Sequence, residues 1–131
     1  MKKRAITTPD VPAIGPYSAA VAAGPFVFVS GQIPLRAETG ELVGGNIRAA
    51  TEQAMKNLAA VLSAAGLTLA DVVKTTIYLA DMADFPAVNE VYGRYFQGDF
   101  PARATIQVAA LPRGAKIEID AIAFRRADGE Q

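Results

Sequence analysis

Cysteine and histidine are both absent from the 131 residues of this chain. Without cysteine there is no disulfide and no thiol nucleophile, and without histidine there is no Ser-His-Asp relay. The usual zinc sites are excluded as well, because they are built from these two residue types. Any catalysis must therefore use carboxylates, lysine, arginine, tyrosine, hydroxyls, backbone groups and water. This set suits a reaction that needs little more than binding, polarisation and a placed water molecule.

A net charge is missing too. Thirteen basic and thirteen acidic side chains cancel, and no run of like charge extends beyond Lys2-Lys3-Arg4. This balance argues against nucleic acid as the main partner. No segment approaches the ~20 apolar residues needed to span a bilayer, and the N-terminus lacks the apolar stretch of a signal peptide. We therefore expect a soluble, cytoplasmic protein that does not contact a membrane.

The length and the 51% hydrophobic content predict one globular domain over residues 1–131. Hydrophobic periodicity predicts the element order β-β-β-α-β-α-β-β, without an internal repeat or linker. Strands are expected at 4–7, 17–23, 26–30, 72–79, 102–108 and 116–124, and helices from the Asn46 cap to Gly66 and from about Asp84 to Gly98.

This order predicts an α+β fold of two layers, with two helices packed against one mixed or antiparallel sheet. Two helices cover only one face of such a sheet. The strands that contain Phe26 and Val72 nevertheless carry apolar side chains on both faces. The uncovered face is therefore expected to pack against another subunit.

Arg103 interrupts the run 102–108, whose alternate positions are otherwise small or apolar. A fixed guanidinium in a half-buried strand needs an anion, and its planar fork of donors matches a carboxylate. The run 116–124 alternates again and brings Glu118 onto a polar face beside Asp120. The sequence thus predicts a cation and a carboxylate on neighbouring strands, with a small carboxylic acid as the ligand.

The short link 111–115 makes the last two strands run in opposite directions, so Arg103 and Glu118 lie toward opposite ends of the sheet. At ~3.3 Å per residue they are expected ~15–20 Å apart in one chain. They cannot then share one ligand. Arg103 of one chain and Glu118 of its neighbour can share one at a subunit boundary, and a cyclic trimer would hold three such sites.

A set of ordered motifs runs through residues 6–126. The motifs are Ala13-Ile14-Gly15-Pro16-Tyr17, Val29-Ser30-Gly31-Gln32-Ile33-Pro34, Val73-Lys74-Thr75-Thr76, Asp84-Phe85 followed by Val88-Asn89, Pro101-Ala102-Arg103 and Ile117-Glu118-Ile119. Together they resemble the RidA (YjgF-like) family of reactive-intermediate deaminases over nearly the whole chain. The resemblance implies a chorismate-mutase-like fold, a six-stranded sheet backed by two helices, assembled as a homotrimer with clefts between subunits.

The resemblance also implies a reaction. Members of this family hydrolyse 2-imino acids and enamines, released by pyridoxal-phosphate enzymes such as threonine dehydratase, to 2-keto acids and ammonia. The substrate is a small carboxylate. An imine conjugated to a carboxylate is electrophilic at C2, so no metal or organic cofactor is expected.

Seven positions match the family's pocket, namely Tyr17, Ser30, Gly31, Asn89, Arg103, Thr105 and Glu118. By this resemblance, Arg103 clamps the substrate carboxylate and Glu118 orients the attacking water. The backbone at Gly31 and Thr105 and the phenol of Tyr17 contact the rest of the substrate. Many relatives carry cysteine in place of Thr105, but a contact made through the backbone tolerates threonine.

Other interpretations stay open. Arg103 alone is also typical of a structural ion pair across an interface, and Glu118 alone of a solvated strand residue. The chain could be a regulatory module that binds 2-keto acids without turnover, which would keep Arg103 but not depend on Glu118. It could also be a ribonuclease or translation inhibitor, although the neutral charge and the lack of histidine disfavour RNA cleavage.

Overall fold

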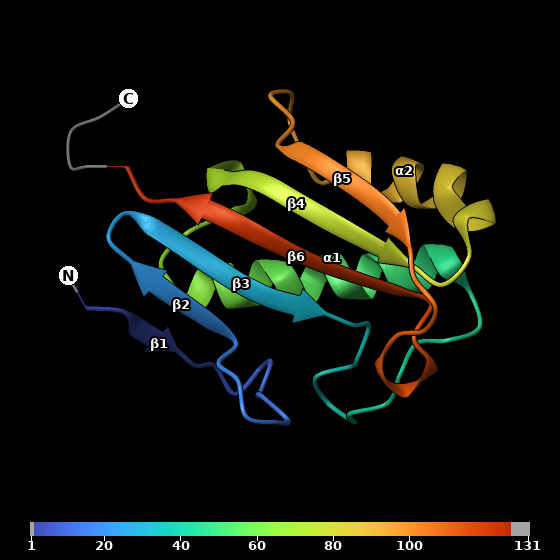
Figure 1. Ribbon diagram of the computed structural model, residues 1–131, viewed down its shortest axis with the longest axis horizontal. Helices are drawn as coiled ribbons and strands as arrows, with labels where there is room; N and C mark the ends of the chain where they lie inside the picture. The colour runs from blue at the N-terminus through green and yellow to red at the C-terminus, as the bar shows by residue number, and fades with distance from the viewer. Residues whose placement is uncertain (1, 127–131) are drawn as a thin grey trace.

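The computed structural model describes residues 2–126, which form a six-stranded sheet with two α-helices across one face (Figure 1). The elements are β1 (Arg4–Ile6), β2 (Ala20–Ala23), β3 (Phe26–Gln32), α1 (Ile47–Ala64), β4 (Val72–Leu79), α2 (Phe85–Gly93), β5 (Ala102–Gln107) and β6 (Ile117–Phe124). The predicted element order and the two-layer α+β architecture are confirmed.

The sheet has the strand order β1-β2-β3-β6-β4-β5, so the last strand of the chain lies in the middle and β5 lies at an edge. Neighbouring strands are antiparallel except β4 and β5, which are parallel because α2 connects them as a crossover. The prediction that Arg103 and Glu118 lie on neighbouring strands is wrong, because β4 separates β5 from β6.

The residues of β6 suit its central position. Its alternate residues are all buried against the helices, as are the alternate residues of β3 and β4 beside it. The buried residues on this side of the sheet include Val27, Val29, Thr75, Ile77, Leu79, Ile117, Ile119, Ala121 and Ala123. An edge position would leave one side of β6 without a hydrogen-bonding partner.

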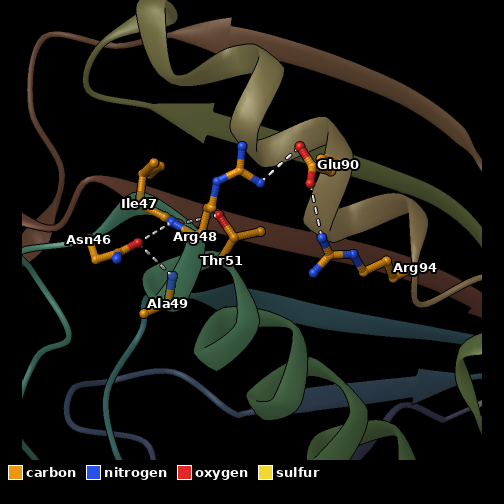
Figure 2. A network of polar contacts seen from close by, with 7 residues as sticks. All are labelled: Asn46, Ile47, Arg48, Ala49, Thr51, Glu90 and Arg94. Carbon is orange, nitrogen blue, oxygen red and sulfur yellow. Dashed lines mark hydrogen bonds and ion pairs between the residues drawn. The ribbon is translucent and has the colours of Figure 1, made fainter.

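The helix α1 begins where its cap predicts. The Asn46 side chain accepts hydrogen bonds from the backbone N–H groups of Arg48 and Ala49, at 2.9 and 3.1 Å, as Figure 2 shows. Such a cap stabilises a helix by about 1 kcal/mol. In the same network Arg48 pairs with Glu90 at 2.9 Å, and Glu90 also pairs with Arg94 at 3.0 Å. The start of α1 is thereby joined to α2.

The helix α2 is shorter than predicted, because it ends at Gly93 and not near Gly98. Beyond Gly93 the backbone N–H groups of Arg94 and Tyr95 bond three residues back, which tightens the chain into turns. Glycine costs about 1 kcal/mol relative to alanine inside a helix, so its presence there favours this early end. Tyr95 and Phe96 still pack against the core from outside the helix.

The face of the sheet opposite the helices is exposed in the single chain. Phe26, Phe28, Val73 and Ile106 each keep 40–46% of their surface exposed on it. Phe26 packs edge-on against Phe124, with ring centroids 5.4 Å apart. Two helices therefore leave one apolar sheet face bare, as the sequence predicted. Within residues 2–126, no helix is both long enough and apolar enough to cross a bilayer.

Candidate active site

Four of the seven predicted site residues share one cavity of about 470 Å³ where β3 ends and β6 begins. They are Tyr17, Ser30, Gly31 and Glu118. The walls include Val11, Ile14, Ile33 and Leu35, so the cavity is mostly apolar. A carboxylate in such a cavity is partly withdrawn from water, which changes its chemistry.

Gly31 lies directly beneath the Glu118 side chain. The pairing of β3 with β6 shifts register between Val29 and Gln32, so the backbone bulges at this point. A Cβ on Gly31 would lie 2.6 Å from Glu118 Cδ and still closer to Oε2. Glycine is therefore required here for space, because any larger residue would displace the carboxylate.

The hydroxyl of Ser30 and the phenol of Tyr17 have different roles in the cavity. Ser30 Oγ donates a hydrogen bond of 2.6 Å to the carbonyl of Ser18. Tyr17 is 48% exposed, and its phenol oxygen accepts a 3.4 Å bond from the backbone N–H of Ile14. Ser30 thus fixes the bulged strand against the preceding segment, whereas Tyr17 remains accessible at the mouth.

Glu118 is electrostatically prepared to hold a proton. Burial raises the pKa of its carboxyl above the ordinary value of 4.5, and the charge of Asp120 raises it further. Asp120 lies two residues along β6 on the same face and accepts a 2.9 Å hydrogen bond from the Tyr78 hydroxyl. A carboxylate with a raised pKa is a better proton acceptor at neutral pH than an ordinary one.

Two other predicted residues, Asn89 and Arg103, line a second hollow of about 430 Å³ beside α2. The hollow is completed by Tyr92, Phe100 and the backbone around them. Arg103 is exposed on the edge strand β5, and the prediction of a half-buried strand is wrong for the single chain. It is wrong because β5 has no neighbour on its outer side.

Two aromatic rings contact the Arg103 guanidinium, and no carboxylate among residues 2–126 forms an ion pair with it. Its Cζ lies 5.4 Å from the ring centroid of Phe85 and 5.2 Å from that of Tyr92. The ion pairs of residues 2–126 join Glu90 to Arg48 and Arg94, so none involves Arg103. The two rings therefore hold the guanidinium, and no anion among residues 2–126 neutralises its charge.

Asn89, which lines this hollow, and Thr105 on β5 each bury a polar oxygen. Within residues 2–126, neither Asn89 Oδ1 nor Thr105 Oγ1 has a hydrogen-bond partner. Thr105 lies on the same face of β5 as Arg103, two residues further along, although it lines neither cavity. Buried oxygens without partners are uncommon and mark places where a further group fits.

The register places Arg103 and Glu118 on opposite faces of the sheet. Glu118 pairs with Tyr78 on the bare face, whereas Arg103 pairs with Thr75 on the helix face. Their backbones lie about 14 Å apart, three residues along the strand and two strand spacings across. This is below the expected 15–20 Å, because the offset along the strand is shorter. One small ligand cannot reach both side chains in one chain.

Phe85 and Tyr92 were not among the site residues predicted from the sequence. Both lie on the side of α2 that faces the core. The pairing of β5 with β4, which brings Arg103 under them, depends on a long-range contact that the local pattern does not contain. Within residues 2–126, no group of three or more acidic side chains is placed to hold a metal ion.

The sequence profile of the family described as Endoribonuclease L-PSP matches residues 7–125. Among known proteins, the chain is 52% identical over 124 residues to the 2-iminobutanoate/2-iminopropanoate deaminase of Mus musculus. That alignment covers 94% of this chain and 92% of the mouse protein.

Solved structures agree with the fold. The crystal structure of the YjgF gene product from E. coli has a TM-score of 0.89 at 43% identity, over 94% of this chain and 99% of that one. The crystal structure of E. coli TdcF with bound serine has a TM-score of 0.89 at 41% identity, with the same coverage of 94% and 99%.

Proposed function

This chain belongs to the Endoribonuclease L-PSP (YjgF/RidA) family, and we propose that it hydrolyses small 2-imino acids and their enamine tautomers to 2-keto acids and ammonia. The proposed substrates are the imines released in the cytoplasm by pyridoxal-phosphate enzymes such as threonine dehydratase. The observation that carries this proposal is Arg103, a held guanidinium with no carboxylate partner among residues 2–126.

Substrate binding begins at Arg103. Its fork donates two parallel hydrogen bonds to the carboxylate of the imino acid, a pairing that lysine cannot reproduce. The backbone at Gly31 and Thr105 and the phenol of Tyr17 contact the remainder of the substrate. Asn89 lines the hollow beside the guanidinium, where its buried Oδ1 can accept an N–H of the substrate.

Glu118 directs the water. The water oxygen attacks C2, the electron pair of the C2=N bond moves to nitrogen, and Glu118 accepts the proton that water releases. Proton transfer of this kind contributes typically 10²–10⁴-fold to a rate. Glu118 then returns its proton to the nitrogen, which gives a carbinolamine. Glu118 next carries the proton of the carbinolamine hydroxyl to the amino nitrogen, the C–N bond breaks, and ammonia leaves as the C=O bond of the 2-keto acid forms. The carboxylate ends the cycle as it began.

The active site is assembled between two subunits of a homotrimer. Arg103 of one subunit and Glu118 of the next meet across the boundary, because within one chain they face opposite sides of the sheet. The bare faces with Phe26, Phe28 and Ile106 pack together in a central barrel-like core. Light scattering on the purified protein tests this assembly, and a monodisperse monomer would remove it together with the shared site.

Coupled turnover tests the activity itself. Threonine dehydratase generates 2-iminobutanoate in situ, and the release of 2-ketobutyrate is followed with and without the purified protein. The proposal predicts release faster than the uncatalysed background, in proportion to the amount of protein. Tight binding of 2-ketobutyrate with no acceleration would instead identify a binding module.

The family description also raises RNA cleavage, which the same preparation tests. Retention on heparin and incubation with single-stranded RNA are the measurements. A chain with no histidine and a net charge of zero is expected to show neither retention nor cleavage.

Replacing Gly31 by alanine is expected to lower kcat by about 10–100-fold, which is part of the 10²–10⁴-fold that proton transfer typically contributes. The new Cβ would occupy the place of the Glu118 carboxyl group, which must swing away from the water. The chain still folds, because the displaced atoms belong to the end of a flexible side chain. Gly44→Ala is the matched control, since a Cβ there meets nothing within 4 Å. Equal kcat values for the two variants would contradict this placement of Glu118.

Replacing Asp120 by asparagine is expected to shift the acid limb of the pH profile of kcat/KM to lower pH. Glu118 must be charged to accept a proton, so activity falls as the pH falls through its pKa. Burial is the main cause of the raised pKa, and Asp120 adds to it, so removing that charge lowers the pKa of Glu118. Glu52→Gln, on α1 behind the sheet, removes one charge as a control. An acid limb that is unchanged in Asp120→Asn would show that Glu118 does not set it.

A further inference from the structure

The two rings that contact Arg103 come from one side of α2. Phe85 and Tyr92 are seven residues apart, which places them two turns and about 10.5 Å apart along a helix. The guanidinium carbon lies over both rings, 5.4 Å from the Phe85 centroid and 5.2 Å from the Tyr92 centroid. Rings attract the cation through their faces and leave its N–H edge unused.

A buried hydrogen bond from β4 holds the Tyr92 ring in place. Its hydroxyl and Thr75 Oγ1 share a hydrogen bond of 2.7 Å, and both residues are almost completely buried. Thr75 is the residue of β4 that pairs with Arg103 of β5. The same strand pair thus carries the arginine and the hydroxyl that fixes its aromatic neighbour. On its outer side, α2 is tied to α1 through Glu90 and Arg48 (Figure 2).

We propose that Phe85, Tyr92 and Thr75 are positioning residues that hold the Arg103 guanidinium ready for the substrate carboxylate. The inference rests on the proposed function for its ligand, a 2-imino or 2-keto carboxylate. An exposed arginine on an edge strand would otherwise sample many rotamers, and binding would have to restrict them. Restricting them in the free protein strengthens binding without adding a contact to the ligand.

Kinetics of three variants test the proposal. Phe85→Leu removes an aromatic face, Tyr92→Phe removes only the hydroxyl, and Thr75→Val removes its partner with little change in shape. Phe85→Leu is expected to raise KM for 2-iminobutanoate and Ki for 2-ketobutyrate by about 3- to 30-fold, the range of one cation-π contact. Tyr92→Phe and Thr75→Val keep both rings and remove one hydrogen bond, so each is expected to raise the two constants by about 2- to 10-fold. We expect kcat to change by less than about 3-fold, because the lost binding is shared by ground and transition states. Tyr95→Phe, in the turn after α2, is the control and should leave both constants unchanged.

An NMR signature separates positioning from general stability. The Arg103 Nε–Hε signal, assigned by its loss in Arg103→Lys, should be shifted upfield by ring currents and show restricted motion. Phe85→Leu should reduce both effects, and Tyr92→Phe, which keeps both rings, should reduce mainly the restriction. The Tyr92→Phe variant also serves if Phe85→Leu does not fold.

The outcomes are distinct. An unshifted, mobile Arg103 signal in the wild type would overturn the proposal, and so would variants that lose the signature yet keep KM and Ki. If the wild type hydrolyses no imine but binds 2-ketobutyrate, the proposed function fails while the effect of the variants on that binding still decides the positioning role. If it does neither, both proposals fall.

Discussion

Arg103→Lys is expected to lower kcat/KM for 2-iminobutanoate by about 100-fold or more, with the assembly intact. Lysine keeps the positive charge but loses the planar fork that grips both carboxylate oxygens. It also loses the flat cation that lies over the rings of Phe85 and Tyr92. A charged hydrogen bond contributes about 1.5–3 kcal/mol, so loss of this pairing and of its orientation accounts for an effect of that size. Steady-state kinetics with dehydratase-generated imine measure it.

The matched control is Arg94→Lys, which makes the same change on the exposed side of α2, where Arg94 pairs with Glu90. It should retain wild-type kinetics. Full activity in Arg103→Lys would remove the carboxylate clamp from the mechanism. A variant that no longer assembles would favour the other interpretation of Arg103, a structural ion pair at a subunit boundary.

Much of the fold follows from local pattern. The helix α1 is long and amphipathic and has a side-chain cap at Asn46, so its position was predicted nearly to the residue. The bare sheet face was predicted from counting helices against strands. The end of α2 was missed because Gly93, inside an apolar helical pattern, begins a series of tighter turns.

The strand order could not be predicted in the same way. Whether β6 pairs with β5 or enters between β3 and β4 depends on contacts between distant segments. The last two strands run in opposite directions, as the short link before β6 predicted, but β4 lies between them, so they do not pair. Arg103 and Glu118 are too far apart to share a ligand within one chain, as expected, and the structure adds a second reason. They lie on opposite faces, and only the register reveals this.

Most residues of the candidate site could be predicted from the sequence only through motifs. All seven predicted residues were expected at one pocket between subunits; within one chain, Tyr17, Ser30, Gly31 and Glu118 line one cavity. The steric need for glycine at position 31 was not foreseen, since it depends on the bulge that places Glu118 over it. The aromatic surroundings of Arg103 depend in turn on the parallel pairing of β4 with β5.

The largest recovery of activity is expected from combining two inactive subunits. Arg103→Ala removes the clamp, and Glu118→Gln removes the proton acceptor while keeping a side chain of the same size. Each homotrimer should be folded and inactive. A mixed trimer, however, contains one boundary at which an intact Arg103 meets an intact Glu118 from the next subunit.

The geometry of a cyclic trimer determines how much activity mixed trimers recover. Each boundary uses Arg103 from one subunit and Glu118 from the next, in one direction around the ring. With two subunits of one kind and one of the other, a single boundary of the three has both groups intact. Mixed trimers should therefore show about one third of the wild-type kcat, whichever variant is in excess.

The complementation assay is the most direct test of an active site shared between subunits. The two variants are co-expressed with different tags, trimers that carry both tags are isolated, and 2-ketobutyrate release is measured against both parents and the wild type. We predict about one third of wild-type turnover at an unchanged KM. Correctly assembled mixed trimers as inactive as their parents would contradict both the shared site and the role of Glu118 as the proton acceptor.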